Sequence, residues 1–238
     1  MAHPNASSNA AKREPRVGRN GGANYSVGYL PNIVSKAFSD QLNSLMNSHY
    51  VTGRDGVEEP MTVPPLVGLL EAQSQGEGTL ISVAHMYRLK EGASDPRWDL
   101  VLAICEVFDV PPSYFSSPVR LDTPGFAREQ LVGEVSHVAV QEVPGDQTLL
   151  PNTVSATFAA RLMALLEAYR SADGSALTFA SLFQRVQKYS AEGFPVSKAQ
   201  MYRLRKGDSM PRWGLIMEIC RVFDVSPDYF SQGLLSHQ

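Results

Sequence analysis

The chain has 238 residues, 43% of them apolar, and a net charge of −3. This length and composition suit two small domains with ordinary hydrophobic cores. No apolar run approaches the roughly 20 residues of a membrane-spanning helix, and the first residues lack the apolar segment of a secretory signal. We therefore expect a cytoplasmic protein that engages no membrane.

Charge is distributed unevenly along the chain. Residues 1–29 hold four Lys or Arg against one acid, and residues 30–117 hold five against eleven. Residues 118–149 hold two against five, whereas residues 150–238 hold ten against seven. The sequence thus predicts a disordered basic arm, an acidic first domain, a linker and a basic second domain.

The two predicted domains are repeats of one another. Residues 86–116 align without a gap with residues 201–231, and 20 of the 31 positions are identical. Upstream, "LPNIVSKAF" (30–38) matches "LPNTVSATF" (150–158), and the number of residues separating these two segments is larger by five than the number separating 86–116 from 201–231. The first repeat therefore carries five extra residues, most simply in "YVTGRDGVEEPMTV". A unit of this length is a domain rather than a solenoid module.

The sequence offers no pattern typical of an enzyme. Cys105 and Cys220 occupy matching positions of the two repeats, which favours two core thiols in a reducing compartment over a disulfide. We find no metal-ligand spacing, phosphate-binding glycine loop or nucleophile elbow. We expect no enzymatic activity, no cofactor and no metal site.

Apolar spacing predicts five helices in each repeat and no strands. In the second repeat, Ser155 is predicted to cap a long helix. One face of this helix carries the apolar residues Phe158, Leu162, Leu165, Leu166 and Tyr169. Thr178 is predicted to cap a second helix, which ends before Gly193 and faces inward with Leu182, Val186 and Tyr189. A third helix is predicted between Ser197 and Gly207. Pro211 or Arg212 is predicted to open a fourth helix, which faces inward with Leu215, Ile216, Ile219, Cys220 and Phe223, and Ser226-Pro227 to open a fifth that ends near Phe230. The equivalent helices of the first repeat centre on Phe38, Leu69, Met86, Ile104 and Phe115. The predicted fold is all-α, with two tandem five-helix domains.

The second and third helices are joined by "AEGFPVS" (191–197), whose twin is "GEGTLIS" (76–82). A helix, a short glycine-containing turn and another helix form the helix-turn-helix plan, which places the outer face of its second helix in the DNA major groove. Val196, Met201 and Leu204 are predicted to face inward. A basic outer face is also typical of a merely solvated helix, but its place in this plan favours DNA.

The third helix ending in Gly207, the following "SMPRW" and the closing "EICRVFDVSPDYF" resemble the lambda-repressor/Cro-like helix-turn-helix (XRE) family of DNA-binding proteins. The resemblance covers roughly residues 35–116 and 155–232. The long first helix and spacious first loop are most similar to the EspR-type nucleoid regulators of actinobacteria. The family resemblance implies two tandem domains of the lambda-repressor type, in a bacterial regulator that acts on the nucleoid.

The resemblance also implies which residues contact DNA. Early positions of the third helix and one position a turn later read bases, the residue before the helix-ending glycine meets phosphate, and the Arg after Pro lies near the backbone or minor groove. In the second repeat these positions are Ser197, Lys198, Ala199, Tyr202, Arg203, Lys206 and Arg212. In the first they are Ser82, Val83, Ala84, Tyr87, Arg88, Glu91 and Arg97.

Two of these positions differ between the repeats in a way that affects DNA binding. Val83 stands where the second repeat has Lys198, and Glu91 stands where it has Lys206. A carboxylate repels phosphate, whereas a lysine releases counterions and gains affinity; Val83 can still touch a thymine methyl. The first repeat is therefore expected to bind DNA weakly, to bind it selectively, or to dock a protein.

Other features have two readings each. Trp98 and Trp213 are expected to be the first core residues of the fourth helices, with stacking on DNA as the alternative. The linker is predicted to hold one helix within 126–143 that packs on a domain or another subunit, although its end also alternates like a strand. The arm, with Lys12, Arg13, Arg16 and Arg19, either enters a groove or holds the DNA backbone, or it is merely solvated.

Three functions remain open from the sequence. The first is a sequence-specific transcription regulator that binds double-stranded DNA as a pseudo-dimer or as two chains. The second is an adaptor whose acidic repeat docks another regulatory protein. The third is an architectural nucleoid protein that bridges DNA sites.

Overall fold

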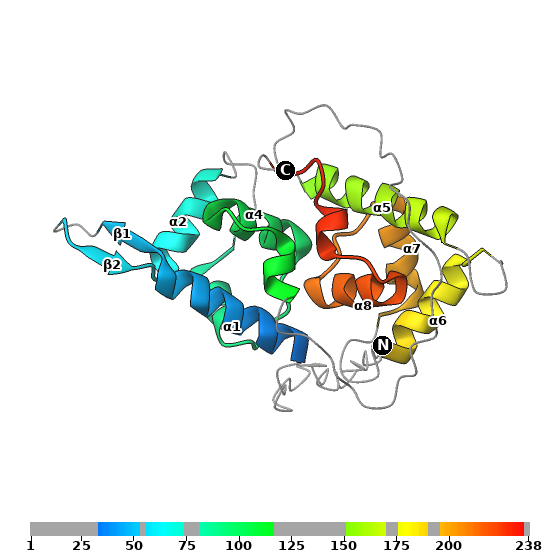
Figure 1. Cartoon of the computed structure of the whole chain (residues 1–238), viewed down its shortest axis with the longest axis horizontal. Helices are drawn as coiled ribbons and strands as arrows, with labels where there is room; N and C mark the ends of the chain where they lie inside the picture. The colour runs from blue at the N-terminus through cyan, green and yellow to red at the C-terminus, as the bar shows by residue number, and fades with distance from the viewer. Residues whose placement is uncertain are drawn as a thin grey trace, which may run out of the picture.

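The computed structural model describes residues 33–52, 56–73, 81–116, 151–169, 176–189 and 196–235. They form two matching series of helices, one at each end of the view in Figure 1. The first series is α1 (Ile33–Ser48), α2 (Val63–Gln73), α3 (Val83–Lys90), α4 (Trp98–Phe108) and the 3-10 helix η1 (Pro112–Ser116). The second is α5 (Pro151–Ala168), α6 (Phe179–Tyr189), α7 (Lys198–Lys206), α8 (Trp213–Phe223) and the 3-10 helix η2 (Pro227–Phe230). The fold is mainly α-helical, as predicted.

The prediction that strands are absent was wrong. The antiparallel strands β1 (Tyr50–Thr52) and β2 (Glu58–Pro60) pair within the segment that carries the extra residues of the first repeat. The hairpin projects from the first series of helices at the far left of Figure 1. Each strand has only three residues, which is too short to show the alternation that marks a half-buried strand. Tyr, Val and Thr are nevertheless residues that favour strands.

The inward faces of the helices agree with the apolar spacing. All five side chains predicted for the first helix of the second repeat are buried, as are Leu182 and Val186 on α6 and the five predicted on α8. Thr178 accepts a hydrogen bond from the Ser181 N–H at the start of α6 (3.1 Å), and Ser226 caps η2. In the first repeat Leu66 and Leu70 face inward, whereas Leu69 is exposed.

One predicted cap was wrong. Ser155 lies inside α5, which begins four residues earlier at Pro151. Proline is tolerated in a first helical turn because its missing N–H has no partner there in any case. Ser155 instead donates from Oγ to the carbonyl of Asn152 (3.2 Å), the local bond available to a serine within a helix.

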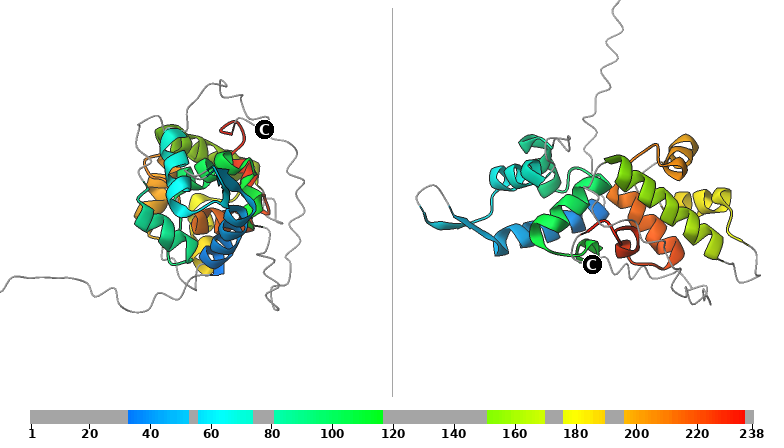
Figure 2. Two further views of the ribbon diagram at one scale, coloured as in Figure 1. Left: turned by 90° about the vertical axis from the view of Figure 1, so that its left-hand side faces the viewer. Right: turned by 90° about the horizontal axis from the view of Figure 1, so that it is seen from above.

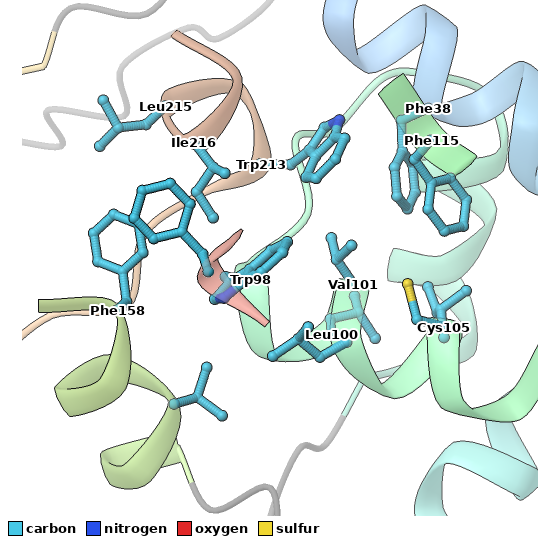
Figure 3. Close-up of a cluster of buried hydrophobic side chains, with 14 of the residues drawn as sticks. Phe38, Trp98, Leu100, Val101, Cys105, Phe115, Phe158, Trp213, Leu215 and Ile216 are labelled. Atoms are coloured by element: carbon cyan, nitrogen blue, oxygen red, sulfur yellow. The ribbon is translucent and has the colours of Figure 1, made fainter. Parts of the chain in front are cut away.

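Two tryptophans join the repeats. Trp98 and Trp213 begin α4 and α8, are both fully buried, and stack with ring centroids 6.0 Å apart and planes inclined by 12°. The Trp213 ring also lies 6.1 Å from that of Phe38 and 6.4 Å from that of Phe115, both in the first repeat. Figure 3 shows the two indoles side by side between the helices of the two series. The buried side chains of both repeats consequently form one continuous cluster.

The backbone pairs at the same place. Arg97 and Arg212 form an antiparallel bridge. The Trp98 N–H donates to the Pro211 carbonyl (2.9 Å), and the Trp213 N–H donates to the Pro96 carbonyl (2.8 Å). Because equivalent residues exchange equivalent bonds, the two repeats are related by an approximate two-fold axis here. We call this contact, made by residues 95–98 and 210–214, the seam.

Several predictions fall outside the described residues. These are the basic arm, the linker with its expected helix at 126–143, the Gly193 helix end and the greater part of both turns before α3 and α7. The side chain of Tyr189 also lies outside them.

Replacing Trp213 by alanine is expected to lower the free energy of unfolding by about 3–5 kcal/mol, the usual cost of truncating a buried aromatic side chain. The loss follows because the ring packs against both repeats. Urea denaturation followed by circular dichroism measures it. Trp213→Phe keeps much of the packing and should cost less. A loss below about 1 kcal/mol for Trp213→Ala would contradict the central position of this ring.

Candidate nucleic-acid interface

Helix α7 is held at both ends. Ser197 caps its start by accepting a hydrogen bond from the Gln200 N–H to Oγ (3.1 Å), as predicted. Gly207 ends it with φ of +76°, and a Cβ there would lie 3.2 Å from Cα of Ala156 on α5. A side chain at this position is therefore opposed both by the backbone conformation and by the close approach of α5.

The inner side of α7 anchors it in the core. Val196, Met201 and Leu204 are buried, as the sequence predicts. On the outer side, the predicted contact residues are exposed and lie on one helix. They are Ser197, Lys198, Ala199, Tyr202, Arg203 and Lys206. The face therefore presents three cationic side chains and one phenol around a small alanine.

Helix α6 supports this outer face. The Phe179 ring at its start lies 5.4 Å from the ring of Tyr202, and the Arg205 guanidinium sits over the same Phe179 ring at 5.5 Å. Tyr202 remains 43% exposed although its ring packs beside that of Phe179. Sequence reasoning missed Phe179, which looked like an ordinary first residue of a helix.

Helix α3 has the same plan with a different surface. Ser82 caps it by accepting from the His85 N–H (3.2 Å), and Met86 and Leu89 are buried. Its end is tied to α1, because Asn43 donates from Nδ2 to the Lys90 carbonyl (3.0 Å). The predicted contact residues Ser82, Val83, Ala84, Tyr87, Arg88 and Glu91 are all exposed. Compared with α7, this surface exchanges two lysines for a valine and a carboxylate.

The two loop arginines lie together at the seam rather than at separate sites. Arg97 forms an ion pair with Asp99, and its side chain is 52% exposed. Arg212 donates from Nη1 to the carbonyl of Asp95 in the other repeat (3.0 Å). Both arginines are exposed. They therefore combine a structural contact with a cationic surface.

The seam arginines also lie close to α3. Burial lowers the pKa of His85 on this helix, and the charges of Arg88, Arg212 and Arg97 lower it further. These effects disfavour the protonated form of His85, and the arginine charges at this point come from both repeats. An anion placed beside α3 at the seam would meet Arg212 from the second repeat as well as Arg97 from the first.

Both views of Figure 2 place α3 and α7 on one side of the molecule, and the right-hand view shows them toward its opposite ends. The seam lies between the two series of helices (Figure 1). The two helices that carry the predicted site residues therefore lie on one side, with the paired arginines at the contact between the repeats.

Asp95 is a buried residue that sequence reasoning missed. Its Oδ1 accepts from the Gly214 N–H at the start of α8 (3.0 Å), and its Oδ2 has no hydrogen-bond partner among the described residues. Burial raises its pKa to about 6, against the opposing effects of the Gly214 hydrogen bond and Arg212. The available signal was the alignment, in which Asp95 stands opposite Met210.

Comparisons with protein-family models, with curated proteins and with solved structures gave no significant match to this chain. Within the described residues, no group of His, Cys, Asp or Glu side chains has the arrangement of a metal site. No helix in this part of the chain has the length and apolar character to cross a bilayer. Cys105 and Cys220 are unpaired and buried, and burial chiefly raises the pKa of each thiol.

The raised pKa of Asp95 gives a pH prediction. The folded chain holds this proton more tightly than the unfolded chain, so the stability of the wild type relative to Asp95→Asn should rise as pH falls from 7 towards 4. A shift of about two pKa units corresponds to roughly 3 kcal/mol. Asn keeps the acceptor for Gly214 but does not titrate, so urea denaturation of both proteins across this range isolates the carboxyl group. A difference that stays constant with pH would contradict the assignment.

Proposed function

We propose that the protein is a sequence-specific, double-stranded-DNA-binding transcription regulator in which α7 is the stronger major-groove reader and α3 the weaker one. The observation that carries this proposal is the outer face of α7, where Lys198, Arg203 and Lys206 are exposed on a helix anchored by a buried inner side. In this proposal α6 with α7, and α2 with α3, are helix-turn-helix units of the lambda-repressor/Cro-like type. The protein would act in the bacterial cytoplasm, on the nucleoid.

The chemistry of the α7 face fits a nucleic acid. Lysine and arginine displace counterions from phosphates, and bidentate arginine or lysine contacts to guanine are the commonest specific base contacts. Ala199 leaves room for close approach of base edges. The packed Tyr202 ring offers its hydroxyl to a phosphate at little cost in side-chain entropy. The N–H groups at the start of the helix add a positive end of the helix dipole.

The arrangement of the repeats supports one chain acting as a pseudo-dimer. Helix-turn-helix dimers place two reading helices on one face, so that they enter successive major grooves. Here α3 and α7 lie on one side of a single chain, and the seam sets their relative orientation. Because Val83 and Glu91 replace Lys198 and Lys206, the expected operator has unlike half-sites.

A second candidate is an adaptor in which the first repeat docks a regulatory protein. It is favoured by the exposed apolar groups Val83 and Tyr87 on α3, which are 39% and 45% exposed, beside the carboxylate of Glu91. Salt distinguishes the two functions: affinity driven by phosphate falls steeply as salt increases, whereas an apolar protein contact does not.

Charge reversal on α7 tests the principal reader. Lys198→Glu, Arg203→Glu and Lys206→Glu together should abolish binding to duplexes selected by the wild type from a random pool, as measured by fluorescence anisotropy. Arg88→Glu with Lys90→Glu should weaken binding less. Equal losses from the two sets would refute the asymmetry, and no selectable duplex at all would refute the function.

An exchange of residues between the repeats supplies a matched control. Lys198→Val with Lys206→Glu gives α7 the residues of α3, and should lower affinity and reduce the slope of log K against log salt by about 1 for each lysine that contacts phosphate. Val83→Lys with Glu91→Lys makes the opposite change on α3 and should raise affinity and steepen the slope. A gain of binding cannot arise from misfolding. If neither pair changes DNA affinity, the two helices do not face DNA.

A genome-wide map of bound sites separates regulation from architecture. A regulator is expected at few, well-defined sites with one asymmetric motif. Binding spread over many weakly related sites would favour the architectural nucleoid protein instead.

A further inference from the structure

We infer that the contact between the repeats, formed by the seam together with the neighbouring Asp99, Ser113 and Asp228, accepts only an unlike repeat: the first repeat pairs with the second, and each rejects a copy of itself. This inference concerns the contact between the repeats and does not depend on whether α7 reads DNA. It rests on three positions at which the repeats differ and at which the differences match across the approximate two-fold axis.

The first two positions are opposite one another. Asp95 accepts from the Gly214 N–H (3.0 Å). The alignment pairs Asp95 with Met210 and Asp99 with Gly214. The two-fold relation that exchanges the Trp98 and Trp213 bonds therefore sets Met210 opposite Asp99 on the other side of the axis. Across the axis each aspartate thus faces an uncharged residue, while within its own repeat Asp99 forms the ion pair with Arg97.

A contact between two copies of the first repeat would lose this complementarity. Asp95 of one copy would stand opposite Asp99 of the other, and the same would occur again across the axis. Both side chains are buried, with 5% and 2% of their surface exposed, so solvent would screen little of the repulsion. Two sites would each confine two carboxylates, and because Arg97 is already paired with Asp99 it leaves Asp95 uncompensated, so such a contact is disfavoured.

A contact between two copies of the second repeat is disfavoured at the third position, which is Ser113 in the first repeat and Asp228 in the second. The Ser113 N–H donates to Oδ1 of Asp228 (2.7 Å), and these two residues are themselves equivalent in the alignment. They therefore meet across the axis. Two second repeats would bring Asp228 against Asp228, and would also lose the aspartate that accepts from the start of α8.

The charge of Asp228 also reaches the cores of both repeats. Burial raises the pKa of Cys105 and of Cys220, and in both cases the charge of Asp228 raises it further. One carboxylate thus acts on equivalent thiols of the two repeats. Only the mixed pair sets a serine, and not a second carboxylate, opposite this charge.

The unlike pairing can be followed in the full chain by the stacked indoles. The chain has two tryptophans, and they form the stacked pair at the seam. Closely stacked indoles give an exciton couplet in circular dichroism, so the couplet reports the contact between the repeats. Trp213→Phe removes one member and defines the signal of a chain without the pair.

Gly214→Asp gives the second repeat the carboxylate of the first and places it opposite Asp95. We expect loss of the couplet while the helical signal is retained. Gly214→Asn is the matched control of equal size without charge and should keep the couplet. Asp95→Met with Gly214→Asp recreates the combination of Met210 with Asp99 and should restore the couplet.

The third position gives a separate test. Ser113→Asp should weaken the couplet by facing Asp228, and Ser113→Asn should not. A couplet unchanged by both Gly214→Asp and Ser113→Asp would overturn the inference. So would failure of Asp95→Met to rescue Gly214→Asp in a chain that retains its helices, because the loss would then be one of fit rather than of charge pairing.

Discussion

The stacking of Trp98 on Trp213 is the contact on which the arrangement of the molecule depends. Each ring begins the fourth helix of its repeat, and Trp213 completes an aromatic cluster of the opposite repeat with Phe38 and Phe115. A helix start that is fixed in this way sets the direction of its helix and of the loop before it. The core of the first repeat would be incomplete if the second were moved away.

The loops that carry the tryptophans also carry Arg97 and Arg212. Their backbones form the bridge between the repeats while their side chains remain exposed. The same short motif therefore contributes an apolar residue to the core, a backbone pair to the seam and a cation to the surface. This combination explains why "PRW" recurs in both repeats better than either a core role or a surface role does alone.

The sequence predicted the helices well because each inward face repeats with the helical period, and the caps at Thr178, Ser197 and Ser226 follow local chemistry. The hairpin was missed because three-residue strands show no period. The Ser155 cap was wrong because several residues before a helix can serve as its start. The seam could not be foreseen, since a buried tryptophan has the same sequence pattern whether it packs within its own repeat or against another. The exposure of the proposed reading face followed directly from helical phase, whereas Phe179 and Asp95 act through neighbours that only the folded chain brings close.

The seam forms within one covalent chain, and this has a consequence for concentration dependence. Two separate subunits associate by a bimolecular step, so a dimer dissociates on dilution and its occupancy of a target rises with more than the first power of concentration. Repeats joined in one chain associate at an effective concentration set by their tether, which is independent of how many molecules the solution holds. A molecule built in this way presents both of its exposed helix faces even when very few copies are present.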